Sequence, residues 1–100
     1  MQDRHSNRER YFNEQVNTTQ KYVIPFVESH LKLNSSSRIL EIGCGEGGNL
    51  KPFLDLNCEV IGVDLSVNKI KLGDDLFRQD SNASNIKLIC EDIYNLTAED

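Results

Sequence analysis

Three short apolar runs alternate with helical patterns along most of the chain. The runs at 39–42, 58–63 and 86–90 are rich in β-branched residues, and each ends at glycine or at an acidic residue. Such runs, bounded by turn-forming residues, are typical of buried strands. Apolar residues between them recur at helical spacing. The order β-α-β-α-β predicts an α/β fold with a parallel sheet and right-handed crossovers.

The two helices between the runs have recognisable starts. Pro52 is tolerated only in the first turn, so the helix expected at 49–56 begins no earlier than Gly48. Ser66 is a good N-cap for the second helix. Gly73 allows that helix to approach the sheet closely, and its expected core residues are Val67, Ile70 and Phe77.

An amphipathic helical segment precedes the first strand. Apolar residues recur at helical spacing over 11–31, and Pro25 predicts a bend or a restart close to it. Residues 1–10 lack this periodicity, so we expect a flexible tail there. Tyr11 and Tyr22 have two interpretations, a lid over a ligand or plain packing against the sheet, and the pattern does not separate them.

The first apolar run leads directly into a cluster of glycines. They occupy positions 43, 45, 47 and 48. Glycines let the backbone turn tightly and leave no Cβ where a ligand must approach closely. A helix that follows such a loop presents free N–H groups at its start. The pattern therefore predicts a strand, a nucleotide-binding loop and a helix.

Two classes of ligand fit this loop on spacing. Gly43-x-Gly45-x-x-Gly48 matches the dinucleotide fingerprint, and Asp64 lies at about the distance of its ribose-binding acid. A dinucleotide, however, brings a pyrophosphate dianion, which Glu41 and Glu46 would repel at close range. The acids favour a ligand with positive charge, and an NAD-type oxidoreductase remains the alternative.

Glu41 followed by Gly43-x-Gly45-x-Gly47, with Val60–Ser66 further on, resembles the class I S-adenosylmethionine (SAM) dependent methyltransferases. Cys90-Glu91-Asp92-Ile93 is similar to the segment with which that family contacts adenine. The resemblance extends over about residues 11–93. It implies a Rossmann-like fold, of which this chain is the β-α-β-α-β half with a helical segment before it. It also implies SAM as cofactor and methyl transfer as reaction, because the sulfonium and ammonium of SAM tolerate acidic neighbours.

The resemblance implies a role in cofactor binding for the glycine loop and for the residues that follow the second and third expected strands. The loop and the following helix start would hold the methionine part, their N–H groups suiting its carboxylate. Asp64 would accept the ribose hydroxyls, and Asp92 would accept the adenine amino group. Leu65 and Ile93 would flank the ring. The predicted cofactor-binding residues are Glu41, Gly43, Cys44, Gly45, Gly47, Asp64, Leu65, Asp92 and Ile93.

Two of these acids also have structural interpretations. Glu41, which the resemblance places near the cofactor ammonium, could instead cap loop N–H groups. Asp64 could assist the helix that starts at Ser66, and that role is compatible with ribose binding. The resemblance identifies no catalytic residue, because the family's acceptor pocket and general base come largely from later strands.

Composition limits the partners, metals and cellular compartments that we expect for this protein. Sixteen acidic residues against eleven basic ones give a net charge of −5, which disfavours nucleic acid as a partner. Cys44, Cys58 and Cys90 are far apart and lack the spacing of a metal site, so we expect no metal and a reducing compartment. No signal peptide or membrane span appears, and we expect the cytoplasm.

One hundred residues is small for this family's domain. We expect residues 11–100 to be the N-terminal, cofactor-binding part of a domain truncated at 100, with a small-molecule acceptor bound elsewhere. If the chain really ended there, its first strand would be an exposed apolar edge through which copies could dimerise. A non-catalytic, partner-binding module of the same fold is a further alternative.

Overall fold

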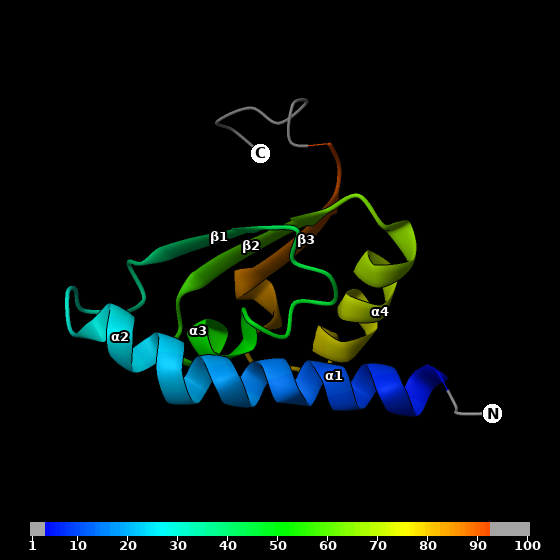
Figure 1. The fold of residues 1–100 in the computed structure, drawn as a ribbon. Helices are drawn as coiled ribbons and strands as arrows, with labels where there is room; N and C mark the ends of the chain where they lie inside the picture. Colours follow the sequence, from blue (N-terminus) through cyan, green and yellow to red (C-terminus); the bar gives the residue numbers. More distant parts are fainter. Residues whose placement is uncertain (1–3, 93–100) are drawn as a thin grey trace.

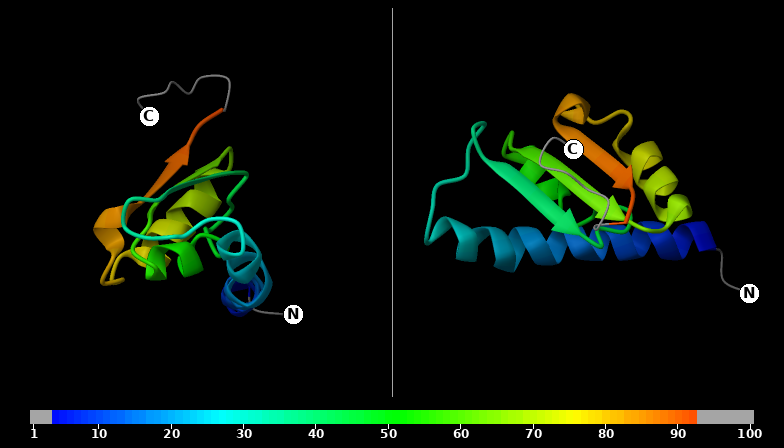
Figure 2. Two further views of the ribbon diagram at one scale, coloured as in Figure 1. Left: turned by 90° about the vertical axis from the view of Figure 1, so that its left-hand side faces the viewer. Right: turned by 90° about the horizontal axis from the view of Figure 1, so that it is seen from above.

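The computed structural model describes residues 4–92 and confirms the predicted parallel sheet. Strands β1 (Arg38–Ile42), β2 (Glu59–Asp64) and β3 (Ile86–Cys90) pair in the order β1-β2-β3, all parallel. Helices α3 (Lys51–Asp55) and α4 (Val67–Phe77) lie together on one face of this sheet (Figures 1 and 2). Both crossovers step in the same direction, so right-handedness places both helices on the same side.

The N-terminal segment forms one long helical rod along that face of the sheet (Figure 1). Its parts are α1 (Arg4–Thr18), a π-helical turn η1 (Thr19–Val23) and α2 (Ile24–Glu28). The Ile24 N–H bonds to the Thr19 carbonyl, and Pro25 lies in the first turn of α2. The predicted restart near Pro25 is therefore confirmed, and a π turn achieves it. No helix within the described residues is long and apolar enough to span a membrane.

The flexible tail predicted for residues 1–10 is wrong from Arg4 onward, because α1 begins there. The cause is a contact that local sequence cannot reveal. The Arg8 guanidinium pairs with the Glu46 carboxylate at 2.8 Å, between residues 38 positions apart. This ion pair fixes the polar start of α1 onto the glycine loop.

Other boundaries differ modestly from the prediction. Helix α3 covers only Lys51–Asp55, because a turn precedes it and Asn57, with φ of 69°, reverses the chain after it. A short 3₁₀ helix η2 (Ala83–Asn85) leads into β3. The Ser66 hydroxyl accepts the Lys69 N–H at 3.2 Å, which confirms the predicted N-cap of α4.

The core lies between the sheet and the helices. It contains Ile70 and Phe77 of α4, as predicted, but Val67 is 52% exposed, so the prediction that Val67 packs inward is wrong. Val67 is the first residue of α4 and lies on its outer side. The largest fully buried apolar side chains are Leu50, Leu54, Cys58, Val60 and Val63.

Strand β1 is an edge of the described sheet, as expected from the topology. Its side chains alternate between the two faces of the sheet. Ile39 and Glu41 are half-buried, whereas Leu40 and Ile42 are 61% and 48% exposed. The sheet face that the helices leave uncovered therefore presents apolar side chains at this edge.

The Gly73→Ala substitution is expected to destabilise the fold although alanine favours helices. An added Cβ would lie 2.6 Å from both the Glu46 carbonyl oxygen and the Leu88 Cδ1 atom. The clash with backbone outweighs a propensity gain of about 1 kcal/mol, leaving a net loss of about 1–3 kcal/mol. Denaturant unfolding measures this, with exposed Asn68→Ala in the same helix as control. An unchanged midpoint for Gly73→Ala would contradict the close packing of α4 on the loop.

Candidate functional site

The glycine loop turns back onto the end of β2. Gly43 and Gly45 have φ values of 73° and 60°, which side-chain-bearing residues rarely adopt. The N–H groups of Gly43 and Cys44 both bond to the Val63 carbonyl, and the Gly45 N–H bonds to Asp64. The predicted tight turn is confirmed. These three N–H groups already bond to acceptors in the protein, however. They are therefore not free to bind the ligand carboxylate that we expected at the loop from the sequence.

Asp64 clamps the loop to the start of α4. Its Oδ2 atom accepts the Gly45 N–H at 2.9 Å and its Oδ1 atom accepts the Ser66 N–H at 2.8 Å. The Ser66 bond above all, with the Gly45 bond and the nearby Lys69 ammonium, holds the pKa of Asp64 below its usual value against the opposing effect of burial. A carboxylate has about four acceptor positions, so capacity remains for hydroxyl donors.

A pocket of about 340 Å³ opens beside this clamp, at the carboxyl ends of the strands. Open α/β sheets bind ligands at this edge. Four of the predicted residues meet here: Gly43, Asp64, Leu65 and Asp92. The sequence interpretation missed three further lining residues, Ile42, Val63 and Glu91. They adjoin predicted residues at the strand ends, so their position in the chain was the available signal.

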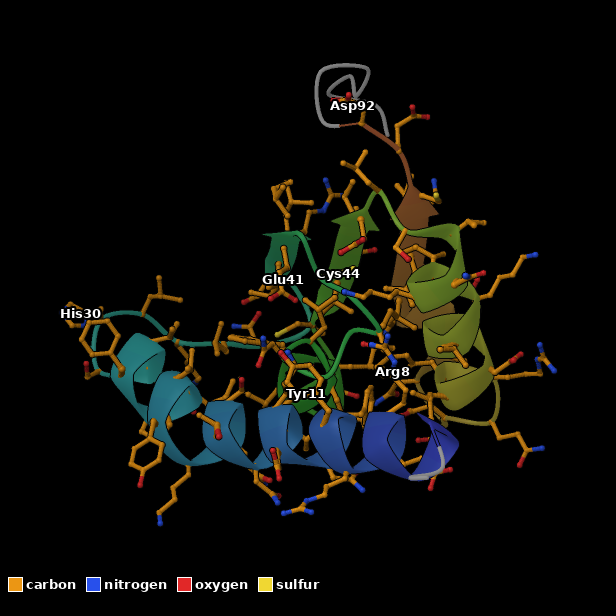
Figure 3. The ribbon with its side chains drawn as sticks, turned by 45° about the vertical axis from the view of Figure 1, so that its right-hand side comes forward. Arg8, Tyr11, His30, Glu41, Cys44 and Asp92 are labelled. Carbon is orange, nitrogen blue, oxygen red and sulfur yellow. The ribbon has the colours of Figure 1, made fainter. Side chains whose placement is uncertain are left out.

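The walls of this pocket combine an open backbone with an exposed apolar side chain. A Cβ on Gly43 would meet no atom within 4 Å, so the backbone there is open to close approach. Leu65 is 74% exposed. Asp92 follows β3 at the same end of the sheet (Figure 3). Ile93, the predicted partner of Leu65, lies outside the described residues.

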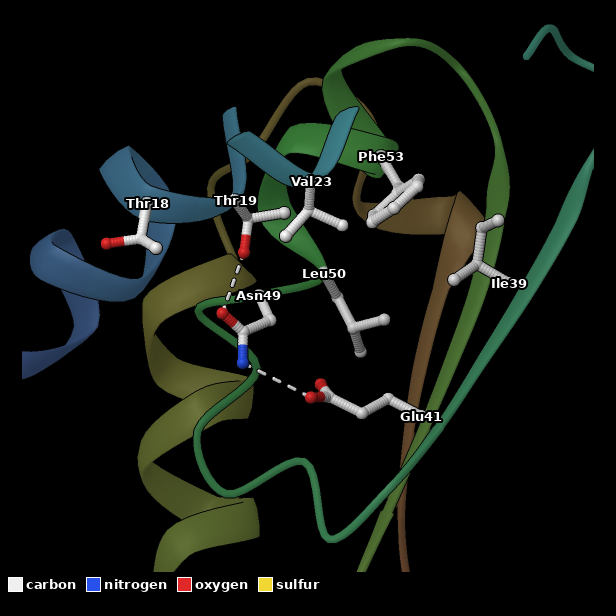
Figure 4. A pocket seen from close by; sticks show the side chains of 8 residues that line it. All are labelled: Thr18, Thr19, Val23, Ile39, Glu41, Asn49, Leu50 and Phe53. Carbon is white, nitrogen blue, oxygen red and sulfur yellow. Dashed lines mark hydrogen bonds between the residues drawn. The ribbon is translucent and has the colours of Figure 1, made fainter. Parts of the chain in front are cut away.

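Glu41 does not line that pocket. It faces a second one of about 320 Å³, which lies on the helix-covered side of β1 (Figure 4). This pocket is lined by Thr18, Thr19, Val23, Ile39, Glu41, Asn49, Leu50 and Phe53. The pleat of β1 explains the separation, because Glu41 and Ile42 point to opposite faces.

The Glu41 carboxylate has one hydrogen-bond partner among residues 4–92. Its Oε2 atom accepts the Asn49 Nδ2 amide at 3.2 Å, so the interpretation that it caps loop N–H groups is wrong. Its Oε1 atom is buried and has no hydrogen-bond partner among the described residues. Burial chiefly raises the pKa of Glu41, and the Asp64 charge adds to this, while the Asn49 bond opposes it.

Glu46 has a structural role. Its side chain is 2% exposed and paired with Arg8, and it does not line the pocket beside Asp64. The expectation that Glu46 would repel a dinucleotide at the loop is therefore wrong. Figure 3 shows Arg8 projecting from α1 on the inner side of the molecule. Arg8 itself gave no signal in the sequence, because it falls in a segment without apolar periodicity.

The cysteines differ sharply in environment. Cys44 and Cys58 are buried, whereas Cys90 is exposed at the end of β3. A free cysteine in a strand is usually expected to pack as a small apolar residue, and Cys90 does not. The Cys44 sulfur packs against Gly62, where an added Cβ would lie 2.6 Å from it. Burial first, then the Glu41 and Asp64 charges, raises the pKa of Cys44 to about 12.

We therefore expect selective alkylation of the folded protein. Iodoacetamide at pH 8 should modify Cys90 and leave Cys44 unmodified, because the thiolate is the reactive form and Cys44 remains a buried thiol. Peptide mass spectrometry reads out each site, and the same reaction in denaturant controls for intrinsic reactivity. Rapid modification of Cys44 in the folded protein would contradict the packing of the loop on Gly62.

The aromatic residues of the N-terminal helical segment differ in exposure. Phe12 is buried and makes an edge-on contact with Phe77, with ring centroids 5.6 Å apart, so it packs in the core. Tyr11 and Tyr22 are 53% and 63% exposed, and neither lines the two pockets described. Their role as a lid remains a prediction.

Comparison with known proteins gives consistent matches. A family model described as a methyltransferase domain matches residues 39–100. The sterol 4-C-methyltransferase strm-1 of Caenorhabditis elegans is 26% identical over 74 residues, which are 74% of this chain and 22% of that protein. This chain therefore spans well under half of that relative.

Solved structures share the fold. A putative SAM-dependent methyltransferase from Methanococcus maripaludis superposes with a TM-score of 0.73 at 11% identity, over 91% of this chain and 42% of that one. The glycopeptide N-methyltransferase MtfA, complexed with S-adenosyl-L-homocysteine, gives 0.66 at 21% identity, over 82% and 34%. PKMT2 from Rickettsia typhi gives 0.58 at 33% identity, over 65% and 13%.

The family match covers more than half of the chain. It includes β1 from Ile39 onward, the glycine loop and the acidic ends of β2 and β3. As the resemblance to class I SAM-dependent methyltransferases predicted, the chain belongs to the methyltransferase-domain family.

Proposed function

We propose that this chain is the cofactor-binding part of a SAM-dependent methyltransferase. The observation that carries the proposal is the pocket beside the Asp64 clamp, at the carboxyl ends of β2 and β3. Asp64 has acceptor capacity for ribose hydroxyls, and Leu65 offers an apolar surface to the adenine ring. Asp92 lies where it could accept an amino group.

The charge of the site supports SAM over a dinucleotide. No basic side chain is among the described residues that line the pocket, and Asp64 keeps its charge because its pKa is lowered. A pyrophosphate dianion placed there would face repulsion without a compensating cation. SAM instead brings a sulfonium and an ammonium, which suit the acidic lining of this pocket, and the Glu41 carboxyl group lies behind the loop in the second pocket.

When bound, SAM supplies an electrophilic methyl group to an acceptor nucleophile. The residues of this chain would bind and orient the cofactor, and such alignment contributes much of the rate in transfer reactions. We propose a small-molecule acceptor, in line with the glycopeptide and sterol named for two relatives. We name no general base.

The context of the site is also a proposal. We place the protein in the cytoplasm, on the wide spacing of its cysteines. We propose that residues 11–100 belong to the cofactor-binding part, now with residues of α1 from Arg4 joined to it. If this chain occurs alone, the exposed Leu40 and Ile42 of β1 favour dimerisation through that edge.

Calorimetric titration of the full-length natural protein tests the proposed function. S-adenosyl-L-homocysteine, the product form of the cofactor, should bind saturably, and NAD should not bind. Binding of NAD alone would replace the proposal with an oxidoreductase. Binding of neither by a folded protein would favour a partner-binding module.

A further inference from the structure

A hydrogen-bonded chain of side chains joins the N-terminal helical rod to β1. The Thr19 hydroxyl donates to the Asn49 Oδ1 atom at 2.8 Å, and the Asn49 Nδ2 amide donates to Glu41 Oε2 at 3.2 Å (Figure 4). The three residues come from the π turn η1, the segment before α3, and β1. Thr19 is 3% exposed, so water competes little for this chain.

Chemistry fixes the direction of these bonds. An ionised carboxylate only accepts, so the Asn49 amide must present its NH₂ group to Glu41. The amide oxygen of Asn49 is then directed at Thr19, whose hydroxyl donates to it. Loss of that hydroxyl removes the donor that Thr19 supplies to the amide oxygen, and the amide could then turn and place its oxygen against the carboxylate.

The π turn holds Thr19 in register with the loop. Thr19 is its first residue, and its carbonyl accepts the Ile24 N–H. π turns are rare and occur frequently at functional sites. Helix α1 also packs tightly beside Asn49, since a Cβ on Gly48 would lie 2.6 Å from Gln15 Oε1 and 2.9 Å from the Phe12 carbonyl. The hydroxyl therefore cannot move independently of the loop.

The series of hydrogen bonds from Thr19 through Asn49 ends at the Glu41 carboxylate, one oxygen of which is buried without a partner among the described residues. Asn49 occupies Glu41 Oε2, while Oε1 is buried without a hydrogen-bond partner among the described residues. A buried anionic oxygen is stabilised strongly by a cationic donor. Glu41 does not line the pocket beside Asp64. The inference therefore requires the amino-acid end of the cofactor to extend from that pocket past the glycine loop, so that its ammonium group is the donor to Glu41.

We propose that Thr19 and Asn49 are positioning residues that orient the Glu41 carboxylate, so that the N-terminal helical rod sets the affinity for the amino-acid end of the cofactor. The inference rests on the proposed function. It assigns roles to two residues that the glycine motif does not include. It also assigns a functional role to the π turn, which places the Thr19 hydroxyl against Asn49.

Two ligands separate this role from a merely structural one. S-adenosyl-L-homocysteine carries the amino-acid end, whereas 5′-methylthioadenosine has the same nucleoside and a thioether without it. In the full-length protein, Thr19→Val should weaken the first about fivefold to tenfold and leave the second unchanged, a loss typical of one hydrogen bond. Thr19→Ser, which keeps the hydroxyl, should restore binding. Gln20→Val is the control, since Gln20 is exposed in the same π turn and lines neither pocket.

A pH profile adds a readout independent of stability. The Asn49 bond lowers the pKa of Glu41, so Asn49→Ala should raise it. Because Glu41 must be ionised to hold an ammonium group, the loss of S-adenosyl-L-homocysteine binding on acidification should then begin at higher pH. Asp64, whose charge also raises the pKa of Glu41, is unchanged in the variant, and so is the neighbouring Cys44 thiol, whose own pKa the Glu41 charge raises.

Suppose that S-adenosyl-L-homocysteine binds the natural protein. The inference would then be overturned if Thr19→Val weakened the binding of both ligands equally, or the binding of neither. If the natural protein bound neither ligand, the proposed function itself would fail, and the inference with it. Thermal unfolding of each variant identifies any that does not fold. If Thr19→Val does not fold, the affinities of Asn49→Ala for the two ligands test the inference in its place.

Discussion

The Asp64→Ala variant is expected to lose cofactor binding by about a hundredfold or more. Asp64 is placed to accept cofactor hydroxyls and also holds the Gly45 and Ser66 N–H groups. The variant removes a charged acceptor from two donors, so the fold should lose about 2–3 kcal/mol as well. Calorimetry with S-adenosyl-L-homocysteine measures the first effect and denaturant unfolding the second.

Two further variants sharpen this prediction. Asp64→Asn keeps one side-chain acceptor and should recover part of the stability but little of the affinity. Asp74→Ala makes the same change of charge at an exposed position of α4 and should leave both measurements unchanged. Near-normal affinity in Asp64→Ala would show that the ligand does not use the clamp.

The Arg8→Met variant is expected to destabilise the fold by about 2–3 kcal/mol. It leaves the Glu46 carboxylate, which is 2% exposed, without its ion-pair partner. The cost lies below that of a fully buried pair because the Arg8 side chain is 45% exposed. Denaturant unfolding provides the measurement.

Controls for this prediction come from the same helix. Arg10→Met removes an exposed pair with Glu14 and should cost less than about 0.5 kcal/mol. The double variant Arg8→Met with Glu46→Met should recover much of the loss, because an apolar pair can replace a buried ion pair. Equal effects of Arg8→Met and Arg10→Met would mean that the start of α1 is not anchored on the loop.

The parts of the fold that were predictable have local signals. The strands are apolar runs ended by glycine or acid, and Ser66 caps a helix as serines commonly do. The placement of Glu41 and Ile42 at different pockets could also have been predicted, because the period-two pleat of β1 directs their side chains to opposite faces of the sheet. Reading all acids near the loop as facing one ligand overlooked that period.

What could not be predicted depends on contacts between distant residues. The ion pair of Arg8 with Glu46 turns an apparent tail into helix, and it turns a presumed ligand-facing acid into an anchor. The bond of Thr19 to Asn49 likewise connects residues 30 positions apart. Such contacts leave no periodicity in the sequence, since each depends on how the rod lies across the loop.

Hydrogen exchange with and without S-adenosyl-L-homocysteine is the most direct test of the central claim, that the cofactor lies at the carboxyl ends of the strands. The loop N–H groups are already bonded to β2, so exchange there requires the loop to open, and a bound cofactor should suppress that opening. We predict slower exchange at residues 43–48 and 64–66, with η2 unchanged. Binding that left these two segments unchanged would contradict the claim.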